Sequence, residues 1–416
     1  MTLKERMLND LLDKYEKSTV YKSGYQGNKR RIMIGPREIE EHYWIRDNAD
    51  RNREFIDILK ELEAQKLVFF TWARFERDNL VKEFWLNTNP EAVEKTYQLI
   101  GRIPQKKKAE MLEEKIGALL PEIQADDIRS FLQDQILWLR ENEKPSRFFF
   151  HAEFDKNDAI LKLLAAVSQN TEEETERILS QRLFHDSKYF EKELKSRLLV
   201  ILRYIDDYDD TGKEYDENLL RERGIVRYPE IMEFCGPISF LMDDGGEIDS
   251  SDEKYGAYVN SMTIRHSKEL FVRKNIQRVL TIENKANYMD YILKEKKEDE
   301  LVLFHGGFYS PIKGRFFRMI REALPDANYV HSGDIDLGGF RMFCRLKREA
   351  FPALVPFQMD IKTLVQYQKR AAYITDENYI HALQELLLQP EYEAFHSVIR
   401  FMIDHKLRLE QEALLY

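Results

Sequence analysis

The sequence lacks the features that mark secreted, membrane-embedded and nucleotide-driven proteins. It has only two cysteines, Cys235 and Cys344, which give neither a disulfide framework nor the spacing of a zinc site. The first residues contain no apolar signal core, and no run approaches 18 apolar residues. No Gly-x-x-x-x-Gly-Lys-Ser loop occurs, so ATP-driven work would have to come from another protein. We therefore expect a cytoplasmic protein that has no contact with a membrane.

What is present is the composition of a folded protein with unevenly distributed charge. The 416 residues are 43% hydrophobic and 33% charged, enough for two or three domains with cores of their own. The net charge of −10 argues against nucleic-acid binding, but residues 1–37 carry nine Lys and Arg against four acidic residues. Residues 21–31 mix cations, aromatics and glycines, as do loops that bind a phosphate backbone, although a solvated basic loop fits equally well. The candidate DNA contacts in this segment are Lys22, Lys29, Arg30 and Arg31.

The N-terminal half divides into two predicted parts. In residues 1–90, an amphipathic helix at 54–66 runs directly into an aromatic, β-branched strand at 67–72. A helix that leads into a strand pair is typical of a winged-helix-like DNA-binding module. Residues 91–225 are almost all helical in pattern and contain no residues that suggest catalysis. They predict a helical arm, and a helical core domain explains them equally well.

The C-terminal half predicts a sheet. Residues 226–275 contain β-type runs that suggest a connecting region, and residues 276–416 alternate short apolar strands with amphipathic helices. The predicted strands are 277–283, 301–304, 328–331 and 354–359, and the predicted helices between them are 285–295, 312–324 and 338–348. This alternation favours a doubly wound, Rossmann-like parallel sheet. The expected class is α/β, within a multidomain α+β chain.

Carboxylates follow two of these predicted strands. Glu283 ends the first strand, and Asp334 and Asp336 follow the third. Because the carboxyl ends of parallel strands converge on one crevice, the three side chains are expected to meet, and they would repel one another unless a cation neutralised them. Hard oxygen ligands suit Mg²⁺ or Mn²⁺ and leave positions for phosphate oxygens. The pattern predicts a phosphodiester-handling metal site, although a glycine-rich tight turn explains Asp334 and Asp336 equally well.

Neighbouring residues have candidate roles and simpler explanations. Lys285 would meet a scissile phosphate, although a lysine at a helix start is more often solvated. His305 would orient water or protonate a leaving oxygen, although a structural histidine is as compatible with its position. Asp360, which follows the predicted strand at 354–359, is a candidate fourth metal ligand on the same sheet edge. Cations at the start of the next predicted helix are candidate phosphate contacts: Lys313, Arg315 and Arg318.

Several segments resemble known families in sequence and order. A strand ending in Glu, a strand followed by His-Gly-Gly and a strand followed by Asp-x-Asp resemble the TOPRIM domain, the Mg²⁺-binding fold of topoisomerases, primases and some nucleases. Residues 282–285, 304–311, 333–340 and 359–360 further resemble the JetD family, the nuclease subunits of Wadjet, a prokaryotic SMC-type system that defends against plasmids. The resemblance is specific over about residues 225–375 and looser over the N-terminal half.

The resemblance implies an activity and partners. Residues 276–416 would be a TOPRIM catalytic domain that cuts double-stranded plasmid DNA with Mg²⁺ or Mn²⁺. SMC, kleisin and kleisin-associated subunits would deliver the DNA, and a homodimer is compatible with this arrangement. The implied catalytic residues are Glu283, Asp334, Asp336, Lys285 and His305, and the implied metal ligands are the three acids among them together with Asp360.

TOPRIM relatives use two kinds of chemistry. In type IIB topoisomerases and meiotic break-forming enzymes, a winged-helix tyrosine attacks DNA and remains attached to it. None of the N-terminal tyrosines here has the Arg-x-x-Tyr-Tyr-like setting of those enzymes, so we expect hydrolysis by metal-activated water. A tyrosine transesterase and a non-catalytic DNA-binding scaffold remain the alternatives. The tyrosines concerned are Tyr15, Tyr21, Tyr25 and Tyr43.

Overall fold

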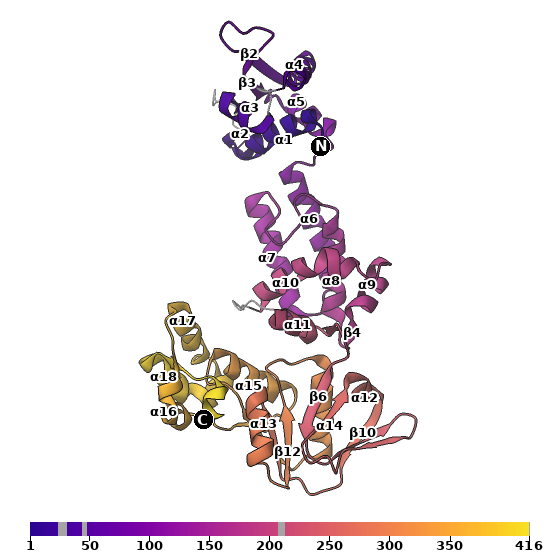
Figure 1. The fold of residues 1–416 in the computed structure, drawn as a ribbon, viewed down its shortest axis with the longest axis vertical. Coiled ribbons are helices and arrows are strands. Elements are labelled where there is room, and N and C mark those ends of the chain that lie inside the picture. The colour runs from indigo at the N-terminus through magenta and orange to yellow at the C-terminus, as the bar shows by residue number, and fades with distance from the viewer. Residues whose placement is uncertain (24–30, 44–47, 207–212, 416) are drawn as a thin grey trace. The chain divides into compact units, whose positions relative to one another are not determined.

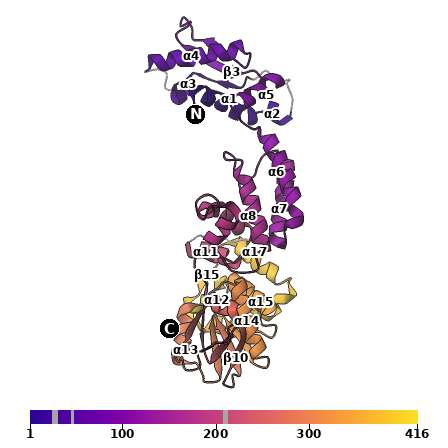
Figure 2. The ribbon, with the colours of Figure 1, turned by 90° about the vertical axis from the view of Figure 1, so that its right-hand side faces the viewer.

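The computed structural model describes residues 1–23, 31–43, 48–206 and 213–415. The protein is a mixed α/β protein, as the sequence predicts. Its internal contacts divide it into two compact units, shown in Figures 1 and 2. The units are Met1–Pro121 with Ser130–Asn157, and Glu122–Arg129 with Asp158–Tyr416.

The first unit begins with helices packed on a small antiparallel sheet. Its elements are α1 (Leu3–Glu16), α2 (Thr19–Ser23), β1 (Met33–Ile34), α3 (Pro36–Tyr43), α4 (Ala49–Ala64), β2 (Val68–Trp72), β3 (Val81–Leu86) and α5 (Pro90–Leu99). The strand order is β1-β3-β2, and both strand pairs are antiparallel. Helix α4 buries Phe55, Leu59 and Leu62, and the side chain of Asn48 caps its start. The predicted helix that leads into a strand pair is therefore α4, followed by β2 and β3.

A mainly helical stretch follows and is shared between the two units. Its elements are α6 (Gln105–Leu119), α7 (Asp126–Asn142), α8 (Lys156–Gln169), β4 (Glu174–Thr175), α9 (Glu176–Phe184), α10 (Lys195–Ile205), α11 (Lys213–Glu222) and β5 (Ile225–Val226). The two short strands, β4 and β5, pair in parallel. The helical pattern of residues 91–225 is thus realised as helices, and the division between the units falls within it.

A six-stranded mixed sheet forms the centre of the second unit. Its order is β14 (Val355–Pro356), β13 (Asn328–Ser332), β11 (Arg278–Ile282), β12 (Glu300–Phe304), β6 (Ile231–Cys235) and β9 (Ala257–Asn260). The first four strands are parallel, whereas β6 and β9 are antiparallel to their neighbours. Two strands of the predicted connecting region, 226–275, therefore complete the same sheet. A second, antiparallel sheet has the order β10 (Ser267–Val272), β7 (Ile238–Met242) and β8 (Glu247–Asp249).

The parallel strands are covered on both faces, as expected for a doubly wound sheet. Helix α13 (Lys285–Lys294) packs with Leu280 and Ile282 of β11 on one face. Helices α14 (Pro311–Ala323) and α15 (Leu337–Glu349) pack with Val279 and Leu301 on the other. The helices that follow the adjacent strands β11 and β13 thus lie on opposite faces. The carboxyl ends of these two strands border a topological switch point, where open α/β sheets bind their ligands.

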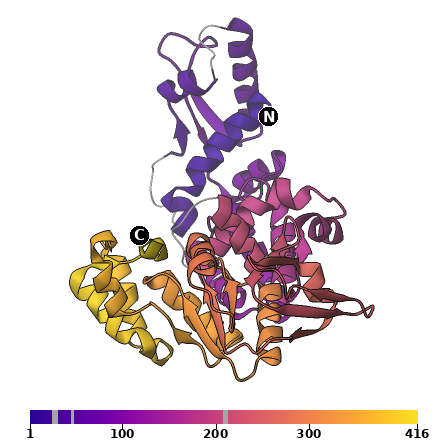
Figure 3. The same ribbon diagram turned by 60° about the horizontal axis from the view of Figure 1, so that its bottom comes forward.

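The C-terminal elements gather beside α15 (Figures 1 and 3). They are α16 (Ile361–Gln366), β15 (Ala372–Tyr373), α17 (Glu377–Leu386), α18 (His396–His405) and β16 (Leu407–Arg408). After β16 the chain returns to the switch point, where Leu409 and Ile335 exchange two backbone hydrogen bonds of 2.9 and 3.2 Å. In the part of the chain that the structure describes, no helix is long and apolar enough to span a membrane.

Candidate metal centre

Glu283 and Asp334 meet at the switch point. Strands β11 and β13 pair so that Ile282 lies opposite Ser332, which brings the residues that follow both strands to the same edge. The backbone N–H of Glu283 donates to the Ser332 carbonyl at 3.0 Å. In return, the backbone N–H of Asp334 donates to Glu283 Oε2 at 3.3 Å. The structure therefore brings these two predicted ligands together.

A glycine makes this approach sterically feasible. A Cβ atom on Gly333 would lie 2.3 Å from Glu283 Oε2 and 2.9 Å from His331 Nε2. Both distances are too short for a side chain, so only glycine leaves room for the carboxylate and the imidazole. His331 is fully buried, and its Nδ1 lies 2.8 Å from the Thr281 hydroxyl. Its Nε2, on the side of Gly333 and Glu283, has no hydrogen-bond partner within the described residues.

Asp336 lies two residues after Asp334 and caps a helix. Its Oδ1 accepts a 2.7 Å hydrogen bond from the backbone N–H of Gly339 at the start of α15. A carboxylate at this position is favoured by the unpaired N–H groups of the first helical turn. Burial nevertheless raises the pKa of Asp336. Its charge also raises the pKa of Glu283 and of Asp334.

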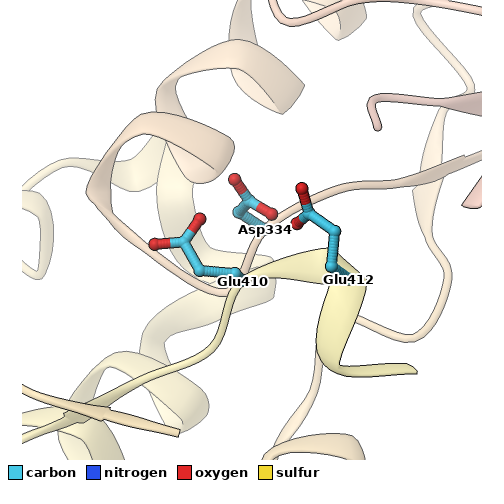
Figure 4. A group of neighbouring side chains, drawn as sticks. All are labelled: Asp334, Glu410 and Glu412. Atoms are coloured by element: carbon cyan, nitrogen blue, oxygen red, sulfur yellow. The ribbon is translucent and has the colours of Figure 1, made fainter. Parts of the chain in front are cut away.

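The C-terminal segment adds two carboxylates that the sequence did not predict. Oxygens of Asp334, Glu410 and Glu412 all lie within 4.8 Å of one another. Figure 4 shows Glu410 and Glu412 on the C-terminal segment, with Asp334 between them. Residues 407–412 alternate buried leucine or glutamine with more exposed charged residues. That period-two pattern in the sequence could have predicted a short extended segment with Glu410 and Glu412 on its exposed side. Nothing in the sequence spacing linked this segment to Asp334.

The acidic side chains perturb one another strongly. Burial, followed by the charges of Asp334 and Asp336, raises the pKa of Glu283 to about 8. Burial and the charge of Asp336 raise the pKa of Asp334 to about 7. A divalent cation would relieve this repulsion. The donors are carboxylate oxygens, the chemistry that Mg²⁺ and Mn²⁺ prefer, so the residues present fit such an ion.

Comparison with known proteins gives two matches to JetD. Residues 247–416 match the family described as Wadjet protein JetD, C-terminal. The whole chain also aligns with the Wadjet protein JetD of Bacillus cereus (strain Q1), at 25% identity over 427 residues that cover 100% of this chain and 99% of the relative. Both comparisons agree with the resemblance to JetD that the sequence motifs show.

The fourth predicted ligand, Asp360, is used as a helix cap. It follows the edge strand β14 and begins α16, where its Oδ1 accepts hydrogen bonds from the backbone N–H and the hydroxyl of Thr363 at 2.8 and 2.9 Å. The group of neighbouring carboxylates around Asp334 contains Glu410 and Glu412, and Asp360 is not part of it. The predicted ligands Glu283 and Asp336 are not part of this group either.

Lys285 lies at the exit of β11 and is held by neighbours. Its ammonium forms an ion pair with Glu233 of β6. It also lies over three aromatic rings, 5.7 Å from the centre of Tyr258, 5.3 Å from Tyr288 and 4.9 Å from Phe304. This arrangement keeps a half-exposed cation two residues from Glu283.

His305 is part of the interior. It is fully buried, it packs against the ring of Phe317 at 5.9 Å, and neither ring nitrogen has a hydrogen-bond partner within the described residues. Burial, together with the positive charge of Lys313, lowers the pKa of His305 well below its ordinary value. A neutral, enclosed imidazole is a poor proton donor, so this placement favours the structural interpretation of His305.

The predicted DNA contacts on α14 separate into two kinds. Arg315 and Arg318 are exposed, and Arg315 donates to the Arg265 carbonyl at 3.2 Å. Lys313 is instead buried and donates to the carbonyls of His305 and Phe308 at 2.6 and 2.8 Å. Its ammonium therefore holds the loop after β12 and does not lie on the surface, where a phosphate would bind.

The N-terminal candidates are partly described. Lys22 is exposed at the end of α2. Arg31 is half-exposed, with its guanidinium 4.0 Å from the ring centre of Trp85 and 3.8 Å from Glu83. Lys29 and Arg30 lie outside the described residues.

Proposed function

We propose that this protein is a metal-dependent DNA endonuclease that hydrolyses phosphodiester bonds of plasmid DNA as a subunit of a Wadjet complex. The observation that carries the proposal is the meeting of Glu283 and Asp334 at the switch point between β11 and β13. The charge of Asp336 raises the pKa of both residues. The mutual repulsion of these carboxylates is costly unless a cation binds there. The strand order around them supports a TOPRIM domain.

Glu283, Asp334 and Asp336 would hold Mg²⁺ or Mn²⁺. Asp334 also belongs to a second group, with Glu410 and Glu412, whose oxygens lie within 4.8 Å of one another. When bound, such an ion supplies charge neutralisation and Lewis acidity at the phosphate. The chain's own residues complete the site. Gly333 keeps space open beside Glu283, and Lys285 keeps a cation near the same sheet edge, where a phosphate oxygen would be attracted.

DNA binding and partners follow from other features. The order α1, β1, α3, α4, β2, β3 with an antiparallel three-stranded sheet supports a winged-helix module, a fold that binds duplex DNA. The relative from Bacillus cereus is named as a Wadjet protein. We propose the same system here, with SMC, kleisin and kleisin-associated subunits that supply the ATP-driven work. The sequence contains no phosphate-binding loop of its own.

The tyrosine alternative is less well supported. Tyr43 is fully buried and its hydroxyl donates to Asp10 at 2.6 Å, and both the burial and this carboxylate raise its pKa. Burial raises the pKa of Tyr21 to about 12, and its hydroxyl accepts from the Lys106 backbone N–H at 2.8 Å. Tyr15 is half-buried and its pKa is also raised. Tyr25 lies outside the described residues. A hydroxyl with a raised pKa is a weak nucleophile.

The proposal is tested on supercoiled plasmid with the purified protein and its Wadjet partners, with and without Mg²⁺ or Mn²⁺. We expect cleavage that requires the metal and that Glu283→Gln abolishes. Glu298→Gln, an exposed residue just before the amino end of β12, is the matched control and should cleave as the unchanged protein does. Cleavage that persists in Glu283→Gln would contradict the proposal. Metal-dependent binding without any cleavage would favour the scaffold alternative.

A further inference from the structure

Gln411 is a buried polar residue with an unusually complete set of hydrogen bonds. Only 2% of it is exposed, although it lies between the exposed Glu410 and Glu412. Its backbone N–H donates to Asp334 Oδ1 at 2.6 Å, and its Nε2 donates to the Ser332 hydroxyl at 2.8 Å.

The same residue also reaches the other side of the switch point. Its Oε1 accepts from the Asn284 backbone N–H at 2.8 Å, and its backbone carbonyl accepts from Asn287 Nδ2 at 2.8 Å. Asn284 directly follows Glu283 and caps α13, whereas Ser332 ends β13. One side chain therefore joins the exits of β11 and β13, the two loops that carry Glu283 and Asp334.

The surrounding C-terminal segment is held in the same place. Leu409 and Ile335 exchange two backbone hydrogen bonds, and the side-chain amide of Asn284 donates to Glu412 at 2.5 Å. These contacts give residues 409–412 a fixed register against Asp334. They bring Glu410 and Glu412 to it in spite of the repulsion between like charges.

We propose that Gln411 is a positioning residue of the metal centre. It fixes the orientation of the Asp334 carboxylate, sets the spacing between Glu283 and Asp334, and makes the C-terminal segment part of the site. This inference rests on the proposed metal-dependent function. Residues that orient metal ligands from outside typically contribute about 10- to 100-fold to metal affinity. Gln411 does so by joining three segments that are far apart in the sequence.

A buried histidine nitrogen beside these ligands lacks a hydrogen-bond partner within the described residues. His331 Nε2 is buried, lies on the Gly333 side that also contacts Glu283, and has no hydrogen-bond partner within the described residues. A buried polar nitrogen without a partner is costly, and water or a bound ligand at the centre would satisfy it. This observation is independent of the acidic side chains.

The test is Mn²⁺ binding by the full-length protein, measured by calorimetry or by electron paramagnetic resonance. Gln411→Ala should weaken Mn²⁺ binding about 10-fold or more, because the variant has no side chain to join the two loops. Leu383→Ala, a buried position on α17, is the control for general loss of stability and should leave the affinity unchanged. Gln384→Ala, on the exposed side of the same helix, is the control for loss of a glutamine side chain.

Ser332→Ala removes only the partner of Gln411 Nε2 and keeps the test valid if Gln411→Ala does not fold. It should weaken Mn²⁺ binding in the same direction by a smaller factor. Unchanged affinity in Gln411→Ala, or in Ser332→Ala if the former does not fold, would overturn the positioning role. If the protein without any substitution binds no Mn²⁺, the proposed metal-dependent function itself is overturned. The two failures are therefore distinguishable.

Discussion

The backbone N–H of Asp334 donates a 3.3 Å hydrogen bond to the side chain of Glu283. Two acidic residues from separate strands are thereby held together, although their like charges repel one another. A cation bound at this sheet edge would offset the repulsion between the two carboxylates. The predictions below follow from this arrangement.

The stability of the metal-free protein should depend on pH. The pKa of Glu283 is raised from 4.5 to about 8, so the folded protein binds this proton more tightly than the unfolded chain does. The free energy of unfolding should therefore fall as the pH rises between these values. Added Mn²⁺ should offset the loss, so the gain in Tm on adding Mn²⁺ should increase from pH 5 to pH 8. Thermal unfolding with and without Mn²⁺ measures this gain.

The matched variant for this experiment is Glu283→Gln, which cannot carry the charge. Without metal, it should be more stable than the unchanged protein above pH 7, and Mn²⁺ should stabilise it less. A gain in Tm that is the same at every pH and in both proteins would argue against a cation site at Glu283.

Gly333→Ala should disable the metal centre. The added Cβ would meet Glu283 Oε2 at 2.3 Å and His331 Nε2 at 2.9 Å, so both groups or the backbone at residue 333 must shift. We expect a loss of about 1–3 kcal/mol in the free energy of unfolding, as for overpacked sites, and weaker Mn²⁺ binding. Denaturant unfolding and metal titration measure the two effects.

Gly117→Ala is the control for this glycine. A Cβ there would meet nothing within 4 Å, and the residue lies inside α6. Its stability should stay the same or rise by about 0.5–1 kcal/mol, because alanine is the better helix former. Equal Mn²⁺ affinities in the two variants would show that the space at Gly333 is not used by the site.

The juxtaposition of Glu283 and Asp334 was predictable, because parallel strands place their carboxyl ends on one edge. Glu410 and Glu412 were not, because no local period relates the C-terminal segment to β13. The burial of Lys313 was missed for a similar reason. From the sequence alone, Lys313 of α14 is expected to be solvated. In the structure its ammonium lies 3.6 Å from the carboxylate of Glu230, the residue before β6. The antiparallel strands β6 and β9 show the same limit: period-two patterns identify strands but do not specify their partners.

The N-terminal basic segment should bind DNA through phosphates. Replacing Lys22, Lys29, Arg30 and Arg31 with alanine should weaken binding to all sequences alike. It should also reduce the salt dependence by about 0.9 in logarithmic slope for each phosphate that the variant no longer binds. The control replaces two exposed lysines: Lys294, at the end of α13 away from the metal centre, and Lys297, in the loop that follows this helix. If the salt dependence of binding is the same in the fourfold variant, the segment does not contact phosphates and the solvated-loop interpretation is favoured.

Tyr43→Phe should keep its cleavage activity, because hydrolysis needs no tyrosine nucleophile. The variant should lose about 1 kcal/mol of stability with the 2.6 Å hydrogen bond to Asp10. DNA products should have free ends that are extracted into the aqueous phase without protease treatment. Protein trapped on a DNA end, together with loss of activity in Tyr43→Phe, would favour the transesterase.

The most direct test of the metal centre is anomalous diffraction from crystals of the protein soaked in Mn²⁺. We predict an anomalous peak beside the carboxylates of Glu283 and Asp334, and its loss in Asp334→Asn. A protein that binds Mn²⁺ only elsewhere, or that shows the same peak in Asp334→Asn, would contradict the account.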